Sequence, residues 1–341
     1  MLLVNGDGRA DELAPGQSVS ITRTSDSTLP GYARRRMGTT TRMDFRDAAR
    51  LDTSRVSDVR GRGGFGGGRG RGAAIGGGGL GIVGLLVALL LGVDPSQLGG
   101  GGADSLGAGG AYGGSGLAST QDLAAQCQTG ADADRDETCR FVALENSLSD
   151  YWTTTVQGLQ PPSTQLFDQG VDTGCGQASS AVGPFYCPAD QGIYLDPGFF
   201  AELQSRYGAQ GGDFAQAYVL AHEYGHHVQH VTGASEQAQQ LSSEGEQSGS
   251  VRLELQADCY AGVWAANAQA SGFITFDDTD IVEGLSAAAA VGDDRIQERS
   301  AGRVDPESWT HGSAEQRQRW FRTGLSSGDP RDCDTFGVPE V

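Results

Sequence analysis

Two histidines stand four residues apart, with a glutamate directly after the first, in the segment His222-Glu223-Tyr224-Gly225-His226. Residues four apart on a helix share one face, so both imidazoles can bind a single zinc ion. Glu223 would then lie where its carboxylate reaches a water molecule on the metal and acts as a general base. The alternative interpretation is two histidines on a solvated helix face without a chemical role.

A third zinc ligand is expected on the next helix, because a catalytic zinc ion is usually held by three protein side chains. The segment Glu254-Leu-Gln-Ala-Asp258 places two carboxylates four residues apart on a helix that is apolar almost all round. Buried carboxylates usually have a partner. We therefore expect Glu254 to bind zinc and Asp258 to accept a hydrogen bond from a ligand imidazole. An ordinary charged helix face is the alternative.

The other three histidines and one arginine could support this site. His227 lies about 100° round the helix from His226 and should point elsewhere. His230 continues the ligand face, but one zinc ion does not easily reach three successive turns, so we expect packing or hydrogen bonding for both. His311 and Arg317 could donate hydrogen bonds to the oxyanion that forms at an attacked carbonyl. A structural role is the alternative for each.

The elements around these residues predict an α+β domain that is mostly helical, with a small sheet before the active-site helix. Asp213 is expected to cap that helix, and Ser313 with Gln316 forms a capping box further on. The segment 192–196 could be an edge strand along which an extended peptide docks. Helices are expected over 135–156, 197–206, 214–231, 248–270, 281–291 and 314–325, and strands over 164–167, 183–186 and 192–195.

Glycine content and net charge differ between the N-terminal part of the chain and the remainder. Of the 54 glycines, 25 fall between Gly61 and Gly116, a stretch that cannot bury enough apolar surface to form a core. Residues 1–72 carry 13 Arg and 8 acidic residues, a net charge of +5, whereas the remainder carries −24. An acidic domain repels phosphate backbones, so nucleic-acid binding is not expected.

An uncharged segment, 73–93, is long enough to cross a bilayer as a transmembrane helix. Several arginines precede it and none follows until Arg135, so the positive-inside rule places the N-terminus in the cytoplasm and the acidic domain outside. A cleaved signal peptide is the alternative. The expected organisation is a disordered Arg- and Gly-rich cytoplasmic tail (1–72), a membrane anchor (73–93), a Gly-rich linker (94–116) and an extracytoplasmic domain (117–341).

Six cysteines all lie beyond the apolar segment, which fits an oxidising compartment. Fifteen pairings are possible. Two equal intervals make sequential pairing the simplest hypothesis: Cys127–Cys139, Cys175–Cys187 and Cys259–Cys333. A buried free thiol at Cys259 is the alternative.

Taken together, these motifs and the segments around them resemble the neutral zinc metallopeptidase family of the YpfJ type, which is similar to the gluzincins. The resemblance runs from about Arg60 to Phe336, and residues 1–42 look additional and could be untranslated. It implies a zincin-like fold, His222, His226 and Glu254 as zinc ligands, and Glu223 as the base. The segments that carry it, in order, are 92–98, 173–179, 183–190, 221–230, 254–264, 310–317 and 328–336.

The function predicted from these observations is peptide hydrolysis by a membrane-anchored zinc peptidase, with a peptide or protein as substrate and no indication of the oligomeric state. A non-catalytic zinc-stabilised binding or scaffold module at the cell envelope is the alternative. A di-metal carboxylate protein is disfavoured, because no second Glu stands three residues before a His.

Overall fold

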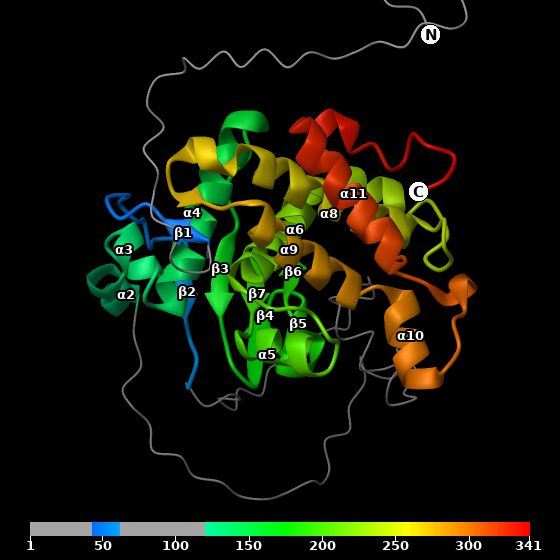
Figure 1. Ribbon diagram of the computed structural model, residues 1–341, viewed down its shortest axis with the longest axis horizontal. Coiled ribbons are helices and arrows are strands. Elements are labelled where there is room, and N and C mark those ends of the chain that lie inside the picture. Colours follow the sequence, from blue (N-terminus) through cyan, green and yellow to red (C-terminus); the bar gives the residue numbers. More distant parts are fainter. Residues whose placement is uncertain (1–42, 62–119) are drawn as a thin grey trace, which may run out of the picture. The chain divides into compact units, whose positions relative to one another are not determined.

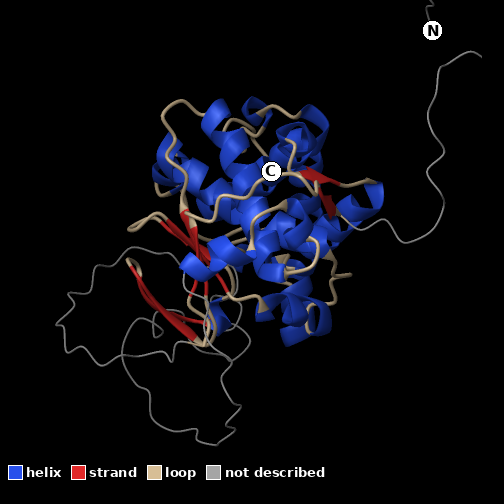
Figure 2. Cartoon of the chain, turned by 90° about the vertical axis from the view of Figure 1, so that its left-hand side faces the viewer, coloured by secondary structure: helices blue, strands red, loops and turns tan. Residues whose placement is uncertain are grey.

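The computed structural model describes residues 43–61 and 120–341, a mixed, mostly helical protein with small sheets (Figures 1 and 2). The helices are α2 (Thr120–Gln126), α3 (Gly130–Ala133), α4 (Glu137–Thr155), α5 (Gly198–Ser205), α6 (Asp213–Thr232), α7 (Ala234–Ala238), α8 (Gly249–Ala268), α9 (Asp278–Ala290), α10 (Asp293–Ala301) and α11 (Ala314–Ser327). The strands are β1 (Asp44–Phe45), β2 (Val56–Asp58), β3 (Ser163–Leu166), β4 (Gly170–Thr173), β5 (Gly176–Ser179), β6 (Phe185–Cys187), β7 (Gly192–Leu195) and β8 (Ile274–Thr275).

Helix α6 lies at the centre and packs against α4, α8 and α9. Most of its residues are buried: residues 214–221 are apolar except for Gln216, and most of the polar residues that follow are buried among the neighbouring elements. It ends at Gly233, whose left-handed backbone (φ 87°) closes the helix. The predicted cap at Asp213 was wrong: Gly212 occupies the cap position, and Asp213, the first helical residue, pairs with Arg140 at 2.7 Å. The other predicted helices are confirmed, including the Ser313–Gln316 capping box.

Glycines allow the helices that carry the candidate site to approach closely. A side chain at Gly225 on α6 would lie 3.1 Å from the backbone Cα of Ala257 on α8. Gly262 on α8 and Gly324 on α11 leave still less room, because a Cβ at either would overlap a backbone carbonyl oxygen of the other helix. These three positions let α6, α8 and α11 pack with their backbones in close contact, where a side chain would not fit.

The main sheet has four strands in the order β2-β3-β7-β6. Strand β3 is parallel to both β2 and β7, while β6 is antiparallel to β7. The prediction that residues 192–196 form an edge strand was wrong, because β7 is paired on both sides and all four of its residues are buried. The edge strands are β2 and β6, and β6 packs against α6.

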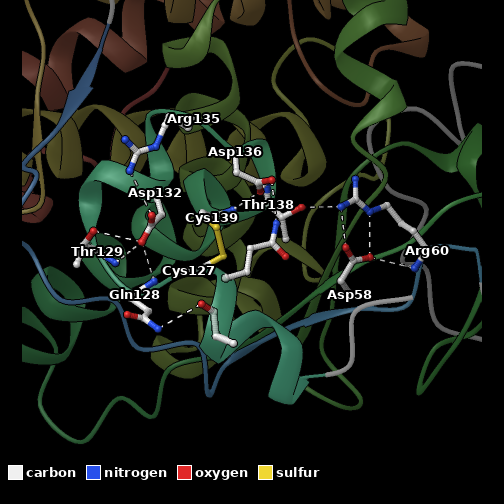
Figure 3. Close-up of a disulfide and its surroundings, with 12 residues drawn as sticks. Asp58, Arg60, Cys127, Gln128, Thr129, Asp132, Arg135, Asp136, Thr138 and Cys139 are labelled. Atoms are coloured by element: carbon white, nitrogen blue, oxygen red, sulfur yellow. Dashed lines mark hydrogen bonds and ion pairs between the residues drawn. A yellow bond between two sulfur atoms is a disulfide. The ribbon is translucent and has the colours of Figure 1, made fainter. Parts of the chain in front are cut away.

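Residues 43–61 belong to the folded unit, which corrects their assignment to a disordered tail. Strand β1 pairs with β8, and β2 extends the main sheet next to β3. Met43, Phe45 and Val56 are at most 2% exposed within the core. Figure 3 shows how the segment is fastened beyond β2: Arg60 donates to Asp58 and to the hydroxyl of Thr138 on α4, both at 2.6 Å. The sequence did not reveal this because the segment is short, polar and far from its partners in the chain.

All three predicted disulfides are present: Cys127–Cys139, Cys175–Cys187 and Cys259–Cys333. The first joins α2 to α4 (Figure 3), and the third ties the C-terminal segment to α8. No cysteine is free. Among the residues described, no helix is long and apolar enough to cross a bilayer. The segments predicted as membrane anchor (73–93) and Gly-rich linker (94–116) lie outside the described residues.

Candidate metal centre

Helix α6 presents His222, Glu223 and His226 within one turn. His222 and Glu223 are each 1% exposed, and the ring centroids of the two histidines are 4.7 Å apart. Helix α8 brings Glu254 opposite them, with its Oε2 3.1 Å from His222 Nε2 and its Oε1 3.4 Å from His226 Nε2. Glu254 follows His226 by 28 residues along the chain, and the two helices bring these side chains together as the sequence predicts.

The spacing of these atoms fits a zinc ion. Ligand atoms from all three side chains lie within 4.8 Å of one another. Zinc–nitrogen and zinc–oxygen bonds of about 2.1 Å at tetrahedral angles separate neighbouring ligand atoms by roughly 3.4 Å. The two measured separations, 3.1 and 3.4 Å, match this value. The cluster of Cys127, Asp136 and Cys139 is no rival site, because its two sulfurs form a disulfide.

Asp258 holds the first imidazole. Its Oδ1 lies 2.9 Å from Nδ1 of His222. This contact favours the tautomer with the proton on Nδ1, which leaves the lone pair on Nε2, the nitrogen that faces Glu254. Burial lowers the pKa of His222, but the charges of Asp258 and Glu254 outweigh burial and raise that pKa to about 9. The negative charge that favours a proton on this ring would equally favour a metal cation.

Asp258 is itself fixed by two further side chains. The hydroxyl of Tyr218 donates to it at 2.5 Å, and Arg317 donates to both of its oxygens, from Nε at 2.8 Å and from Nη2 at 3.0 Å. Asp258 and Arg317 are fully buried. Burial opposes the charge of Asp258, yet Arg317 and His222 lower its pKa. Arg317, expected as a possible oxyanion donor, is therefore engaged with Asp258.

Gln229 holds the second imidazole, a role that the sequence analysis missed. Its Oε1 lies 2.8 Å from Nδ1 of His226, and its Nε2 donates to the backbone carbonyl of Leu253 at 2.7 Å. Gln229 is three residues after His226 on the same helix, and Tyr218 is four residues before His222. Helical spacing from the two ligand candidates could have found both.

Glu223 is a buried carboxylate with one oxygen unused. Its Oε1 has no hydrogen-bond partner among the described residues, and burial raises the pKa of this carboxyl, although the neighbouring histidines oppose the shift. A small apolar hollow lies beside it, lined by Phe199, Leu203 and Val219 among others. A buried, unpaired oxygen at this position is what a group that exchanges a proton with a bound molecule requires.

His311 approaches from the start of α11 and is 4% exposed. Its Nδ1 lies 3.3 Å from Asp293 Oδ1 and 2.9 Å from the hydroxyl of Thr310, which leaves Nε2 without a protein partner among the described residues. Burial lowers the pKa of His311, but Asp293 outweighs it and raises that pKa. Asp293 also accepts three backbone N–H groups, from Thr310, His311 and Gly312. It is 18 residues away in sequence, and no local pattern pointed to it.

His227 and His230 do not join the cluster. The buried ring of His227 contacts the hydroxyl of Tyr186 at 3.0 Å and the carbonyl of Gln160 at 2.7 Å, which ties α6 to β6. His230 lies beside the same tyrosine, with ring centroids 6.1 Å apart. Both residues were expected to pack or hydrogen-bond rather than to bind metal, and the structure agrees: His227 hydrogen-bonds to Tyr186 and Gln160, and His230 packs against Tyr186.

Comparison with known proteins shows the family of the chain. The model of the family described as "Putative neutral zinc metallopeptidase" matches residues 43–336. The chain belongs to this family. Its relatives include uncharacterized protein Rv2575 of Mycobacterium tuberculosis, 52% identical over 224 residues, which cover 63% of this chain and 76% of the relative.

Another relative, uncharacterized protein YpfJ of Escherichia coli, is 42% identical over 232 residues, covering 65% of this chain and 80% of the relative. No solved structure matches the chain. The match begins at residue 43, where the described structure also begins, so the docked N-terminal strands belong to what the family shares.

Proposed function

We propose that the chain is a zinc peptidase in which His222, His226 and Glu254 hold the metal and Glu223 is the general base. The observation that carries the proposal is the convergence of three ligand atoms from α6 and α8 beside a buried carboxylate oxygen that has no partner in the part of the chain that the structure describes. A purely structural zinc site normally uses four protein ligands and needs no such carboxylate. The two packed helices and the adjacent sheet also suit the zincin-like fold expected from the sequence.

Each side chain of the site has a separate role in the proposed reaction. A bound zinc ion supplies Lewis acidity and lowers the pKa of water to about 7. Glu223 takes a proton from the attacking water and passes it to the leaving amine, and its raised pKa suits both transfers. His311 can direct its free Nε2 at the oxyanion, while Asp293 holds the ring. Asp258 and Gln229 keep the two ligand imidazoles in place.

The peptide would dock along β6 rather than β7. Strand β6 is the edge of the sheet nearest α6, and Tyr186 on it contacts His227. Pro184, directly before β6, lines the apolar hollow beside Glu223. A peptide that extends this edge by backbone hydrogen bonds would therefore pass the base.

The test compares the full-length protein with Glu223→Gln and with Glu236→Gln, the same chemical change at an exposed position on α7. Zinc content is measured by mass spectrometry, and cleavage is profiled in a peptide library with and without chelator. We expect about one zinc per chain in all three proteins. Chelator-sensitive cleavage should persist in Glu236→Gln and fall by about 10²- to 10⁴-fold in Glu223→Gln.

Full cleavage by zinc-loaded Glu223→Gln would contradict the assignment of the base. Bound zinc without cleavage of any peptide by the wild type would instead favour a non-catalytic zinc-stabilised module.

A further inference from the structure

A second hollow, of about 380 Å³, lies behind the candidate metal centre. It is lined by residues that follow α5 and by one face each of α9, α10 and α11. Gln318 on α11 lines this hollow, while the preceding residue, Arg317, reaches the metal centre. The two sites therefore lie on different faces of α11, because successive helical residues point about 100° apart, and nothing in the proposed peptidase chemistry uses the second one.

The lining of the second hollow is positively charged in a strongly acidic part of the chain. Arg295, Arg299 and Arg322 contribute to it, and no Asp or Glu does. Residues 73–341 contain only 11 Arg against 35 acidic residues, so three of these 11 gather in one place. Among the described residues, none of the three forms an ion pair with a carboxylate, whereas Arg140, Arg206 and Arg317 do. Cations gathered without counter-charges repel one another.

Neutral groups in the same hollow are also ready to donate hydrogen bonds. Tyr207 is 4% exposed, and its hydroxyl has no hydrogen-bond partner within residues 43–61 and 120–341. A buried hydroxyl without a partner is costly, and a bound molecule would satisfy it. The hydroxyl of Ser286 accepts the backbone N–H of Gln210 at 2.9 Å, so its own hydrogen stays available.

We propose that this hollow binds a phosphate group through Arg295, Arg299 and Arg322, with the hydroxyl of Tyr207 as a further donor. Guanidinium groups match phosphate oxygens in pairs, which makes arginine well suited to this anion. The group can come from free inorganic phosphate or from the headgroup of an anionic phospholipid, since both offer the same oxygens.

The experiment measures thermal unfolding of the full-length protein in sodium phosphate and in sodium chloride of equal ionic strength. The variant is Arg299→Gln/Arg322→Gln. The control is Arg319→Gln, an exposed arginine on α11 that does not line the hollow. Phosphate should raise the unfolding midpoint of wild type and control. Its apparent affinity should fall at least about tenfold in the double variant. Phosphate that binds a metal ion would act equally on all three proteins, so the difference between them reports the hollow.

A parallel measurement identifies the source of the phosphate. Co-sedimentation uses phosphatidylglycerol vesicles, with phosphatidylcholine vesicles for comparison. Binding to the anionic vesicles that the double variant loses supports the proposal with a lipid as the source, and a phosphate effect without vesicle binding supports it with a free anion. Equal midpoints in phosphate and chloride together with no vesicle binding would overturn the proposal. An equal loss in Arg319→Gln would also overturn it, because net charge alone would then explain the effect.

Discussion

Replacing Gly324 with alanine tests whether the close approach of α8 and α11 holds the metal centre together. A Cβ at this position would overlap the carbonyl oxygen of Cys259 and lie 2.8 Å from the backbone nitrogen of Val263. Restoring an ordinary carbon–oxygen contact of about 3.3 Å requires the helices to separate by roughly 1 to 1.5 Å. Both obstructing atoms belong to backbone, so no side chain can turn aside.

Overpacking by Gly324→Ala should lower the free energy of unfolding by about 3 kcal/mol, at the upper end for such changes. The higher helix propensity of alanine should return up to ~1 kcal/mol. For a folded unit of this size, a net loss of 2 to 3 kcal/mol lowers the unfolding midpoint by roughly 5 to 10 °C. The same displacement stretches the 2.8 Å contact between Arg317 on α11 and Asp258 on α8 beyond hydrogen-bonding distance. Zinc affinity should therefore fall about tenfold.

Calorimetry gives the midpoint, and competition with a chelator of known affinity gives the zinc binding constant. Ser326→Ala, an exposed substitution on the same helix, is the control and should leave both unchanged. A midpoint of Gly324→Ala at or above that of the wild type would refute the close packing of α8 and α11. A lower midpoint with unchanged zinc affinity would refute the link between this packing and the metal centre.

Three further changes test other parts of the structure. Asp258→Asn should lower zinc affinity about 10- to 100-fold in equilibrium dialysis while the protein stays folded. Asp293 raises the pKa of His311, so the pair stabilises the fold while His311 is protonated and Asp293 is ionised. This stabilisation is lost as pH rises through the folded-state pKa of His311, and also when the pH falls far enough to protonate Asp293. Asp293→Asn should therefore cost about 2 kcal/mol at pH 5.5 in urea denaturation and much less at pH 9. A constant cost would contradict the assignment. Cys259→Ser/Cys333→Ser opens a long loop and should lower the free energy of unfolding by about 4 to 5 kcal/mol; an unchanged midpoint would show that the bridge is not formed.

Patterns that repeat along one helix could be predicted from the sequence. Apolar spacing predicted α4, while Gly233 marked the end of α6 and the Ser313–Gln316 capping box marked the start of α11. The four-residue interval predicted the shared face of His222 and His226. Glu254 could be placed because a carboxylate on an apolar helix needs a partner. Such arguments work because each depends on neighbours within one or two turns.

Features that depend on distant parts of the chain could not be predicted in this way. Strand β2 has only three residues, and its place in the sheet is set by pairing with β3, more than 100 residues later. The support of His311 by Asp293 joins α10 to the start of α11 across a loop. The role of Gly225 becomes visible only when α8 packs against it. Sequence periodicity carries no information about these contacts, because the partner is chosen by the tertiary fold.

The docked strands 43–61 also limit how the chain can meet a membrane. Strand β2 hydrogen-bonds directly to β3, so residues 43–61 and 120–341 must lie on the same side of any bilayer. A topology that separated these two segments would break the pairing of β2 with β3. Cysteines introduced at the exposed positions Ala48 and Ser326 should then react with a membrane-impermeant reagent on the same side. The pairing of β2 with β3 therefore fixes the relative topology of the two segments.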